Sequence, residues 1–216
     1  MMEDNRRPLK VRGNILSQRF ASYLSKKDIT PNQISITSIV ASLIASIFIL
    51  FISNDNFFTI WIFPILGALF IQIRLLCNLF DGMVALEGGK STKSGELFND
   101  IPDRVSDSLL FIALGYCVSN ISFGVELGYL AALFAALTAY VRVLGISINA
   151  GSCFKGPMAK QHRMAVLTIS LICTPFEFIY FGTDYILILT LFIIVVGSFF
   201  TIINRIKTIY NTLEGK

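Results

Sequence analysis

The stretch Asn78–Asp107, NLFDGMVALEGGKSTKSGELFNDIPDRVSD, is a polar interruption between two long apolar segments. Asn78 and Asp81 stand three residues apart at its start, and Asp103 and Asp107 stand four residues apart at its end. Residues at these intervals share one side of a helix. Two antiparallel helices joined by a short glycine-rich loop are therefore predicted, with their polar sides facing each other. Because ionisable residues are expensive inside a membrane span, they mark a functional site by default.

The chain around this stretch is strongly apolar, with 54% hydrophobic residues among 216. Six of its apolar runs are long enough to cross a bilayer as helices. Runs of this kind become helices because every backbone polar group in hydrocarbon must be satisfied within its own segment. We expect an all-α integral membrane protein with six transmembrane helices and no separate soluble domain. The runs are Ile34–Ile52, Phe57–Phe80, Ile101–Val118, Leu127–Ile148, Met164–Phe181 and Tyr185–Ile203.

Lysine and arginine are distributed unevenly between the connecting segments. They lie in the N-terminal arm, the second loop, the fourth loop and the C-terminal tail, whereas the loops near Asp55, Ser119–Glu126 and Thr174–Asp184 contain none. Cytoplasmic loops carry the excess of these residues. Both termini and the polar stretch are therefore expected on the cytoplasmic side, and we predict a bacterial inner membrane. The net charge of +4 reflects this topology, so we expect no nucleic-acid partner.

The N-terminal arm, residues 1–32, is basic and carries apolar residues that can form one side of a helix. Such a helix is expected to lie on the anionic membrane lipids, and a solvated basic segment is the alternative. Thr30, Pro31 and Asn32 are typical of a helix start. We expect a membrane domain over residues 33–210 and a cytoplasmic tail over residues 211–216. The apolar residues of the arm are Leu9, Val11, Ile15, Leu16, Phe20, Tyr23 and Leu24.

The polar stretch supplies carboxylate and amide oxygens but no histidine or cysteine between Asn78 and Asp107. Oxygen donors of this kind select hard cations such as Mg²⁺ and Mn²⁺. Mg²⁺ takes few protein carboxylates and completes its shell with water and substrate phosphates. Glycine-rich backbone with Lys90 and Lys93 nearby suits a phosphate-bearing ligand. The pattern predicts a centre for metal-assisted phosphoryl transfer.

The same side chains allow a second interpretation, a structural ion-pair network. Arginines within and just before the stretch can neutralise its carboxylates. Both interpretations can hold together, because arginines often orient carboxylates that bind metal ions. The members of the network are Arg74, Arg104 and Asp107, with Asp81 and Asp103.

The spacing of these residues resembles the motif of the CDP-alcohol phosphotransferases. That motif reads Asp-x-x-Asp-Gly-x-x-Ala-Arg, eight residues, Gly, three residues, Asp, three residues, Asp. Every interval is kept here, and the expected spans and cytoplasmic termini extend the resemblance over nearly the whole chain. The matching positions are Asn78, Asp81, Gly82, Ala85, Leu86, Gly95, Asn99 and Asp103.

The resemblance implies an enzyme that binds CDP-diacylglycerol in a cytoplasm-facing polar cavity within the membrane lipids, together with one or two Mg²⁺ or Mn²⁺ ions. The final motif acid, Asp103, is then the general base for a polar alcohol that attacks the lipid-side phosphorus, and CMP leaves. A homodimer is implied as well. The implied metal ligands are Asn78, Asp81, Asn99 and Asp103. The implied nucleotide-binding residues are Asp81, Gly82, Ala85, Lys90, Lys93 and Gly95.

Two departures from the motif bear on metal and nucleotide. Asn78 and Asn99 replace two aspartates, and amides supply no charge to a hard cation. The number of ions is therefore open, with Asp100 or Asp107 as possible compensation. The alternative function is a catalytically impaired member that binds nucleotide-lipid or metal without turnover. Leu86 replaces an arginine, for which Lys90 or Lys93 can substitute.

The third departure is Pro102 in the third apolar helix. It either lies one turn inside the helix, where it frees the carbonyl of Phe98, or stands at a helix start that Asn99 or Asp100 caps. The second arrangement is favoured.

Basic residues also lie at the cytoplasmic side of the fourth and fifth spans. Relatives of the family that act on phosphorylated acceptors place basic residues here. We hypothesise an anion pocket for acceptor or lipid phosphate, and ordinary positive-inside charge is the alternative. The residues are Arg142, Lys160 and Arg163, of which Arg142 sits deepest within an apolar run.

Overall fold

The computed structural model describes residues 15–27, 29–87 and 94–215. Helices dominate this part of the chain, and no β-strand occurs among these residues. Each of the six predicted apolar runs lies in a helix, apart from at most two residues at an end. The elements are α1 (Ile15–Lys26), α2 (Pro31–Leu50), the π-helical turn η2 (Phe58–Ile62), α3 (Phe63–Glu87), α4 (Gly95–Cys117), α5 (Gly124–Ser147), α6 (Lys160–Phe181) and α7 (Tyr185–Leu213).

Five helical segments are long and apolar enough to cross a membrane: α2, η2 continued into α3, α5, α6 and α7. The protein is therefore an integral membrane protein. The helix α4 has 23 residues and the length of a span, but the charged residues in its first half set it apart from the other five. The six predicted runs thus divide into five apolar helices and one polar-faced helix.

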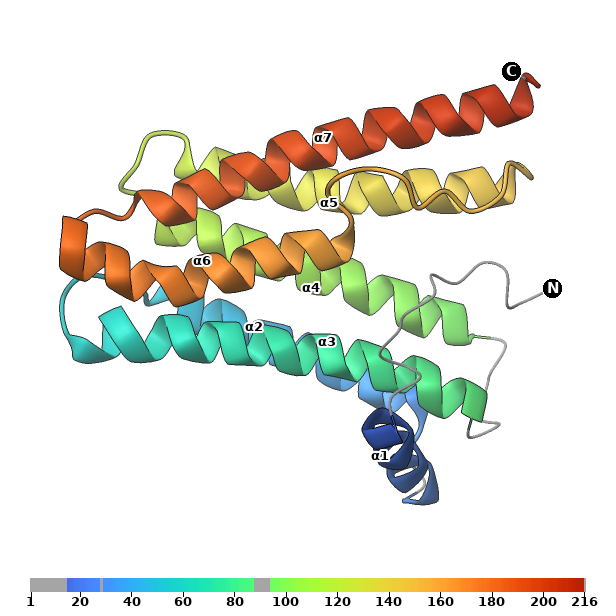
Figure 1. The fold of residues 1–216 in the computed structure, drawn as a ribbon, viewed down its shortest axis with the longest axis horizontal. Helices are drawn as coiled ribbons and strands as arrows, with labels where there is room; N and C mark the ends of the chain where they lie inside the picture. Colours follow the sequence, from blue (N-terminus) through green and yellow to red (C-terminus); the bar gives the residue numbers. More distant parts are fainter. Residues whose placement is uncertain (1–14, 28, 88–93, 216) are drawn as a thin grey trace.

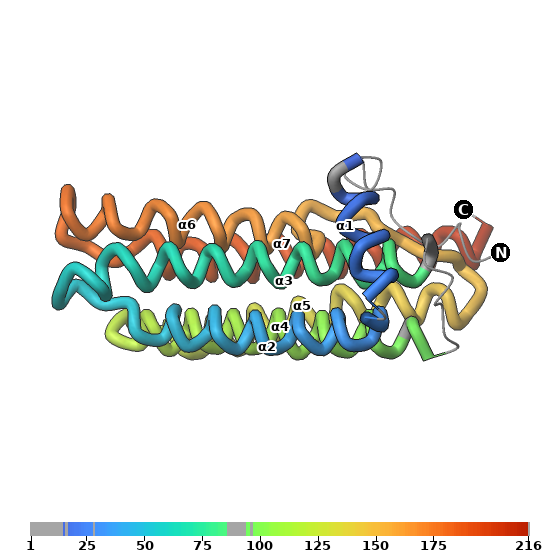
Figure 2. The backbone as a smooth tube through the Cα atoms, turned by 90° about the horizontal axis from the view of Figure 1, so that it is seen from below, coloured from blue at the N-terminus to red at the C-terminus, as the bar shows by residue number. Residues whose placement is uncertain are grey.

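The six long helices form a closed ring around a packed interior. Neighbours follow the order α2, α4, α5, α7 and α6, and α3 closes the ring by packing on both α6 and α2. Figure 2 shows α2, α4 and α5 in one layer and α3, α6 and α7 in the other. In Figure 1 the end of α3, the start of α4 and the C-terminus lie at the same end of the bundle. Polar residues near the α3–α4 connection therefore lie at one end of the ring.

The start of α2 follows from three consecutive residues, as predicted. Thr30 is the N-cap: its hydroxyl accepts the Gln33 N–H at 3.3 Å, and the Gln33 side chain accepts the Thr30 N–H at 2.9 Å. Pro31 occupies the first helical position, where its missing N–H costs nothing. This reciprocal capping fixes where the chain enters the bundle from α1.

The helix α1 lies outside the ring and packs on α3. Ala21 is buried in this contact, and the rings of Phe20 and Phe80 have centroids 4.7 Å apart. Ile15 and Tyr23 stay exposed. A helix is therefore present where the arm was predicted to form one, with exposed apolar residues beside its contact with α3. Leu9 and Val11 of the predicted apolar side lie outside the described residues.

Small residues allow the ring helices to approach closely. A Cβ on Gly115 of α4 would lie 2.8 Å from the Cα of Gly128 on α5, so neither position accepts a side chain. On α2 a buried serine ladder consists of Ser38, Ser42 and Ser46, and each hydroxyl donates to a carbonyl of its own helix. The ladder lets α2 pack tightly between α3 and α4 without leaving a polar atom unpaired.

The helix that carries Pro102 is α4, and it begins earlier in the sequence than the favoured prediction placed its start. The helix α4 starts at Gly95, and Pro102 lies inside it, so the prediction of a cap at Asn99 or Asp100 is wrong. Proline removes only one bond, the one its own nitrogen would donate to the Phe98 carbonyl. An ion pair between Arg104 and Asp100, one turn apart, supports the helix on either side of Pro102.

Candidate active site

A buried ion triad crosses the interior of the ring. The Arg74 side chain of α3 is fully buried, and its Nη2 lies 2.6 Å from Oδ1 of Asp107 on α4. The other oxygen, Oδ2, accepts from Nη2 of Arg163 on α6 at 2.8 Å. Removing one partner of such a group leaves an unpaired buried charge. The triad therefore joins three helices and fixes which side of α4 faces the interior.

Asp103 lies one turn nearer the start of α4, surrounded by donors. Its Oδ1 accepts from Nδ2 of Asn78 at 2.8 Å and also from the ammonium of Lys160. The Arg74 Nη2 lies 3.6 Å from the same oxygen. Side chains from α3 and α6 thus orient this carboxylate. The amide of Asn78 acts here as a donor to Asp103.

Asp81 is the least satisfied carboxylate of this region. It is buried, and its Oδ2 accepts a hydrogen bond from the Ser35 hydroxyl of α2 at 2.7 Å. The other oxygen, Oδ1, is buried with no hydrogen-bond partner in the described part of the protein. An unpaired buried carboxylate oxygen is costly, so it requires an explanation such as a bound ion. Asn78 shares its side of α3 and reaches Asp103, so Asp81 and Asp103 belong to one polar site.

Carboxylate and amide oxygens are the donors that this region offers to a divalent cation. Within the described ranges, no group of three or more His, Cys, Asp or Glu side chains is placed to hold a metal ion. Asp81 and Asp103 are the carboxylates of the motif, with the neutral amides of Asn78 and Asn99 beside them in the sequence pattern. Mg²⁺ needs only one or two protein carboxylates when substrate phosphates complete its shell. The Oδ1 of Asp81 would therefore serve as one protein ligand of such an ion, with Asp103 as the other motif carboxylate.

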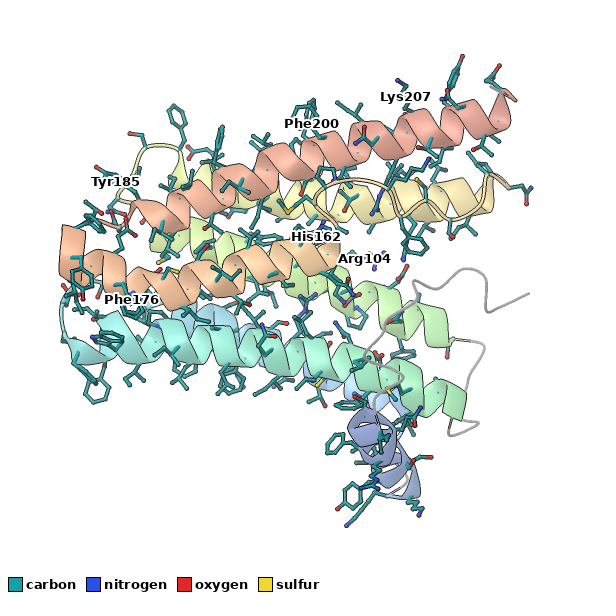
Figure 3. The ribbon with its side chains drawn as sticks, in the orientation of Figure 1. Arg104, His162, Phe176, Tyr185, Phe200 and Lys207 are labelled. Carbon is teal, nitrogen blue, oxygen red and sulfur yellow. The ribbon has the colours of Figure 1, made fainter. Side chains whose placement is uncertain are left out.

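A polar cavity of about 180 Å³ opens beside Asp103, between α4, α5 and α6. Its walls include Asn99, Lys160 and Arg205. On one side, Asp100 accepts hydrogen bonds from Arg104 at 3.0 and 3.1 Å and from Arg142 at 3.0 and 3.2 Å. Figure 3 shows Arg104 on α4 near the start of α6, at the end of the bundle away from Phe176 and Tyr185. Cations outnumber carboxylates in this cavity, so an anionic ligand suits it.

The three basic residues predicted for an anion pocket do line one cavity, although their environments differ. Arg142 and Lys160 are about a quarter exposed, whereas Arg163 is almost fully buried and also donates to the Thr138 hydroxyl. Arg163 therefore links α6 to α4 and α5 within the ring. Arg142 and Lys160 remain accessible from the cavity.

The ion-pair interpretation is correct in part. Arg74 neutralises Asp107 and lies close to Asp103, as that interpretation expected. Arg104 pairs with Asp100 rather than with Asp81, because Asp100 stands one turn before it on the same helix. Among the residues that the structure describes, Asp81 therefore has no arginine partner.

Other predicted residues lie at the same end of the bundle. Gly82 and Ala85 follow Asp81 on α3, and Gly95 is the first residue of α4. Lys90 and Lys93 lie outside the described residues.

Two residues of the site were missed by the sequence reasoning. Ser35 reaches Asp81 and is the first of four buried serines at helical spacing on α2, a pattern that was available in the sequence. Arg205 of α7 donates to the Lys155 carbonyl. It lies two residues beyond the predicted span Tyr185–Ile203, close to Lys207, so no signal in the sequence separated it from ordinary positive charge at a span end.

Comparison with known proteins finds sequence similarity to phosphatidylinositol phosphate and archaetidylinositol phosphate synthases. No family model matches the chain. It is 27% identical over 199 residues to phosphatidylinositol phosphate synthase from Streptomyces avermitilis, covering 88% of this chain and 76% of that protein. It is 26% identical over 155 residues to archaetidylinositol phosphate synthase from Pyrococcus horikoshii, covering 71% and 74%. These relatives agree with the resemblance of the chain to the CDP-alcohol phosphotransferases.

The fold of the chain is similar to that of a solved enzyme. Phosphatidylinositol phosphate synthase from Mycobacterium tuberculosis, solved with CDP-DAG bound, superposes with a TM-score of 0.75 at 18% identity and covers 91% of this chain and 94% of its own. The same enzyme in complex with manganese and citrate gives a TM-score of 0.71, again at 18% identity, covering 90% and 88%. The two solved structures thus share their fold with about nine tenths of this chain.

Proposed function

We propose that the protein is a metal-dependent phosphatidyltransferase that moves a phosphatidyl group from CDP-diacylglycerol to a polar alcohol and releases CMP. The observation that carries the proposal is the buried, unpartnered Oδ1 of Asp81 beside the oriented carboxylate of Asp103. The Oδ1 of Asp81 is available to a cation, and the carboxylate of Asp103 is positioned to accept a proton. The relatives named for phosphatidylinositol phosphate and archaetidylinositol phosphate synthesis support the same reaction class.

Asp81, Asn78, Asn99 and Asp103 are the proposed ligands of Mg²⁺ or Mn²⁺. Such an ion supplies charge neutralisation for the diphosphate and polarises the phosphorus that is attacked. The Ser35 hydroxyl holds the second oxygen of Asp81, which leaves Oδ1 for the ion. The donor is proposed to lie along Asp81, Gly82, Ala85 and Gly95, where small residues allow close approach.

Asp103 is the proposed general base. The acceptor oxygen forms a bond to the lipid-side phosphorus, its proton passes to Asp103, and the bond from that phosphorus to the CMP oxygen breaks. Asn78 and Lys160 fix the carboxylate from two sides, so its orientation does not depend on the substrate. A positioned base of this kind typically contributes a factor of about 10²–10⁴ to the rate.

The cavity beside Asp103 is the proposed acceptor site. Its volume of about 180 Å³ suits a small headgroup, and Arg142 and Lys160 line it together with Arg104. Guanidinium groups bind phosphate through paired hydrogen bonds. We therefore propose an acceptor alcohol that carries a phosphate monoester. Arg163 contributes through the ion triad rather than through direct contact.

The proposed topology has six spans, with α4 as the sixth and its polar side turned into the ring. The membrane domain covers residues 33–210, although α7 continues to Leu213, and a tail over 211–216 follows. The helix α1 lies along the inner leaflet, both termini and the active site face the cytoplasm of a bacterial inner membrane, and the protein is a homodimer. The end of the bundle that carries Arg104 and Lys207 is then the cytoplasmic end (Figure 3).

The test is CMP release by the purified protein from labelled CDP-diacylglycerol with a panel of phosphorylated and neutral alcohols. Release should require Mg²⁺ or Mn²⁺ and stop when a chelator is added. Asp81→Asn should lose both turnover and Mn²⁺ binding measured by electron paramagnetic resonance. The matched control is Asp55→Asn on the loop before η2, which should keep both. Absence of CMP release with every acceptor in the presence of metal overturns the proposal.

A family member that binds its ligands without turnover is the second candidate, because Asn78 and Asn99 leave only two motif carboxylates. The double variant Asn78→Asp, Asn99→Asp separates the two functions. Turnover by the native protein supports the transferase. Turnover that appears only in the double variant supports the binding protein.

A further inference from the structure

The cavity beside Asp103 contains a carboxylate of the protein itself, the side chain of Asp100. Both Nη atoms of Arg104 donate to it, one to each oxygen, at 3.0 and 3.1 Å. The Nη2 of Arg142 donates to the same two oxygens at 3.0 and 3.2 Å. A forked guanidinium pairing is also the way arginine binds phosphate. Asp100 therefore occupies the position that an anionic ligand of these arginines needs.

The charges in this part of the cavity do not cancel. Asp103 and Asp107 are paired with donors of α3 and α6. Asp100 is the carboxylate that pairs with both Arg104 and Arg142, so two positive charges face one negative charge. A phosphate monoester carries about 1.5 to 2 negative charges at neutral pH and has more acceptor oxygens than a carboxylate. Such a ligand balances the pair of arginines better than Asp100 does.

Exposure separates Asp100 from the other carboxylates of the site. Its side chain is 31% exposed, compared with 14% for Asp103 and 5% for Asp107. Asp100 and its two arginines are each a quarter to a third exposed, so water screens these ion pairs. In addition, the Nε of Arg142 is buried and has no hydrogen-bond partner among the described residues. Asp100 can therefore be displaced at low cost, and Arg142 keeps an unpaired donor for a larger anion.

We infer that Asp100 is an internal competitor for the acceptor phosphate: it holds Arg104 and Arg142 when no phosphate is bound and releases Arg142 when a phosphate monoester enters. The inference rests on the proposed function and deepens it by assigning a specificity-determining residue. A carboxylate tethered beside the arginines is present at a high effective concentration. It excludes weakly binding anions from the cavity and lowers the affinity for phosphate at the same time.

The experiment compares the native protein with Asp100→Asn, which keeps the shape and removes the charge. The expected result is a KM for a phosphorylated acceptor and a dissociation constant for inorganic phosphate that are both lower by about fivefold, the factor for a partly exposed ion pair. The KM for CDP-diacylglycerol and kcat should stay within about twofold. Phosphate binding is measured by calorimetry without the donor. Asp55→Asn is the matched control at the other end of the bundle.

Any of the following three results overturns the inference. Weaker phosphate binding in Asp100→Asn means that Asp100 positions the arginines, and unchanged binding means that it does not compete. A lower KM for CDP-diacylglycerol instead of the acceptor assigns the cavity to the diphosphate of the donor. Asp100→Ser serves as a second variant if the first does not fold. Because phosphate binding needs no turnover, it still decides the role of Asp100 if the native protein releases no CMP and the proposed function fails.

Discussion

The two ends of the bundle use buried carboxylates in opposite ways. At the end marked by Tyr185 in Figure 3, Glu177 of α6 accepts from the Thr183 hydroxyl at 2.9 Å and from the N–H groups of Tyr185 and Ile186 at 2.7 to 3.2 Å. These donors belong to the start of α7, where the helix dipole also favours negative charge. At the other end, Asp81 is just as buried but keeps an unpaired oxygen.

The difference lies in hydrogen bonding within the described residues, and it is the reason that a functional role is proposed for Asp81 and not for Glu177. Glu177 is only 5% exposed, yet both oxygens are satisfied by the chain, so the group closes the junction between α6 and α7. Asp107 is likewise satisfied, by arginines on both sides. Asp81 keeps one oxygen without a hydrogen-bond partner in the described part of the protein. Asn78 and Lys160 orient the carboxylate of Asp103 in the same polar site. Burial does not distinguish Asp81 from Glu177, whereas the hydrogen bonds that each carboxylate accepts do.

The largest expected effect on turnover is that of Asp103→Asn. The amide keeps the shape but accepts no proton, so CMP release should fall by about 10²–10⁴-fold. Thermal unfolding in detergent checks that the fold is kept. A variant with native turnover removes Asp103 as the base and leaves its contacts with Asn78 and Lys160 as structural.

Asp107→Ala should produce the largest loss of stability. The change leaves Arg74 and Arg163 buried without their partner, which lowers the free energy of unfolding by about 3–5 kcal/mol. Denaturant titration of the detergent-solubilised protein measures it. A loss below about 1 kcal/mol, the range of exposed pairs, would show that the triad is solvated.

Glu177→Gln tests the opposite end of the bundle. Loss of charge weakens the hydrogen bonds to the start of α7, so the free energy of unfolding should fall by about 1–3 kcal/mol. The kcat/KM of the folded variant should equal that of the native protein. A large drop in kcat/KM without unfolding contradicts the contrast between the two ends.

Ser35→Ala should have the smallest effect. Without the hydroxyl, Asp81 loses the hydrogen bond that holds Oδ2, and outer-shell changes of this kind weaken metal binding by roughly tenfold. Mn²⁺ titration followed by electron paramagnetic resonance measures the dissociation constant. Ser53→Ala, on the loop between α2 and η2, is the matched control. Equal Mn²⁺ affinity in both variants argues against an ion at Asp81.

The sequence predicted the helices well because apolar runs in a membrane protein leave few alternatives to a helix. Helical spacing together with the short connection between the two helices predicted Asn78, Asp81 and Asp103 in one polar site, and the contact between Asn78 and Asp103 is consistent with that. Spacing along one helix says nothing of which helices become neighbours. The approach of Ser35 to Asp81 and of Arg142 to Asp100 depends on the ring order, so these contacts required the structure.

The start of α4 was predicted wrongly for a related reason. Proline usually stands in the first turn, and Asn99 and Asp100 are good caps, so local chemistry favoured a start near Pro102. The structure continues the helix back to Gly95, and Asp100 pairs with Arg104 and Arg142 instead of capping. Tertiary ion pairs thus override the local preference.

The triad of Arg74, Asp107 and Arg163 has a consequence for how the chain is made. Asp107 lies near the middle of the 23-residue α4, where a charged residue costs about 2.5–3.5 kcal/mol to insert. Arg74 is synthesised before Asp107 and Arg163 after it. The proposed sixth span therefore meets its first counter-ion as soon as it emerges, and α3 and α4 are expected to leave the translocon together as a hairpin. Arg163 then joins when α6 arrives.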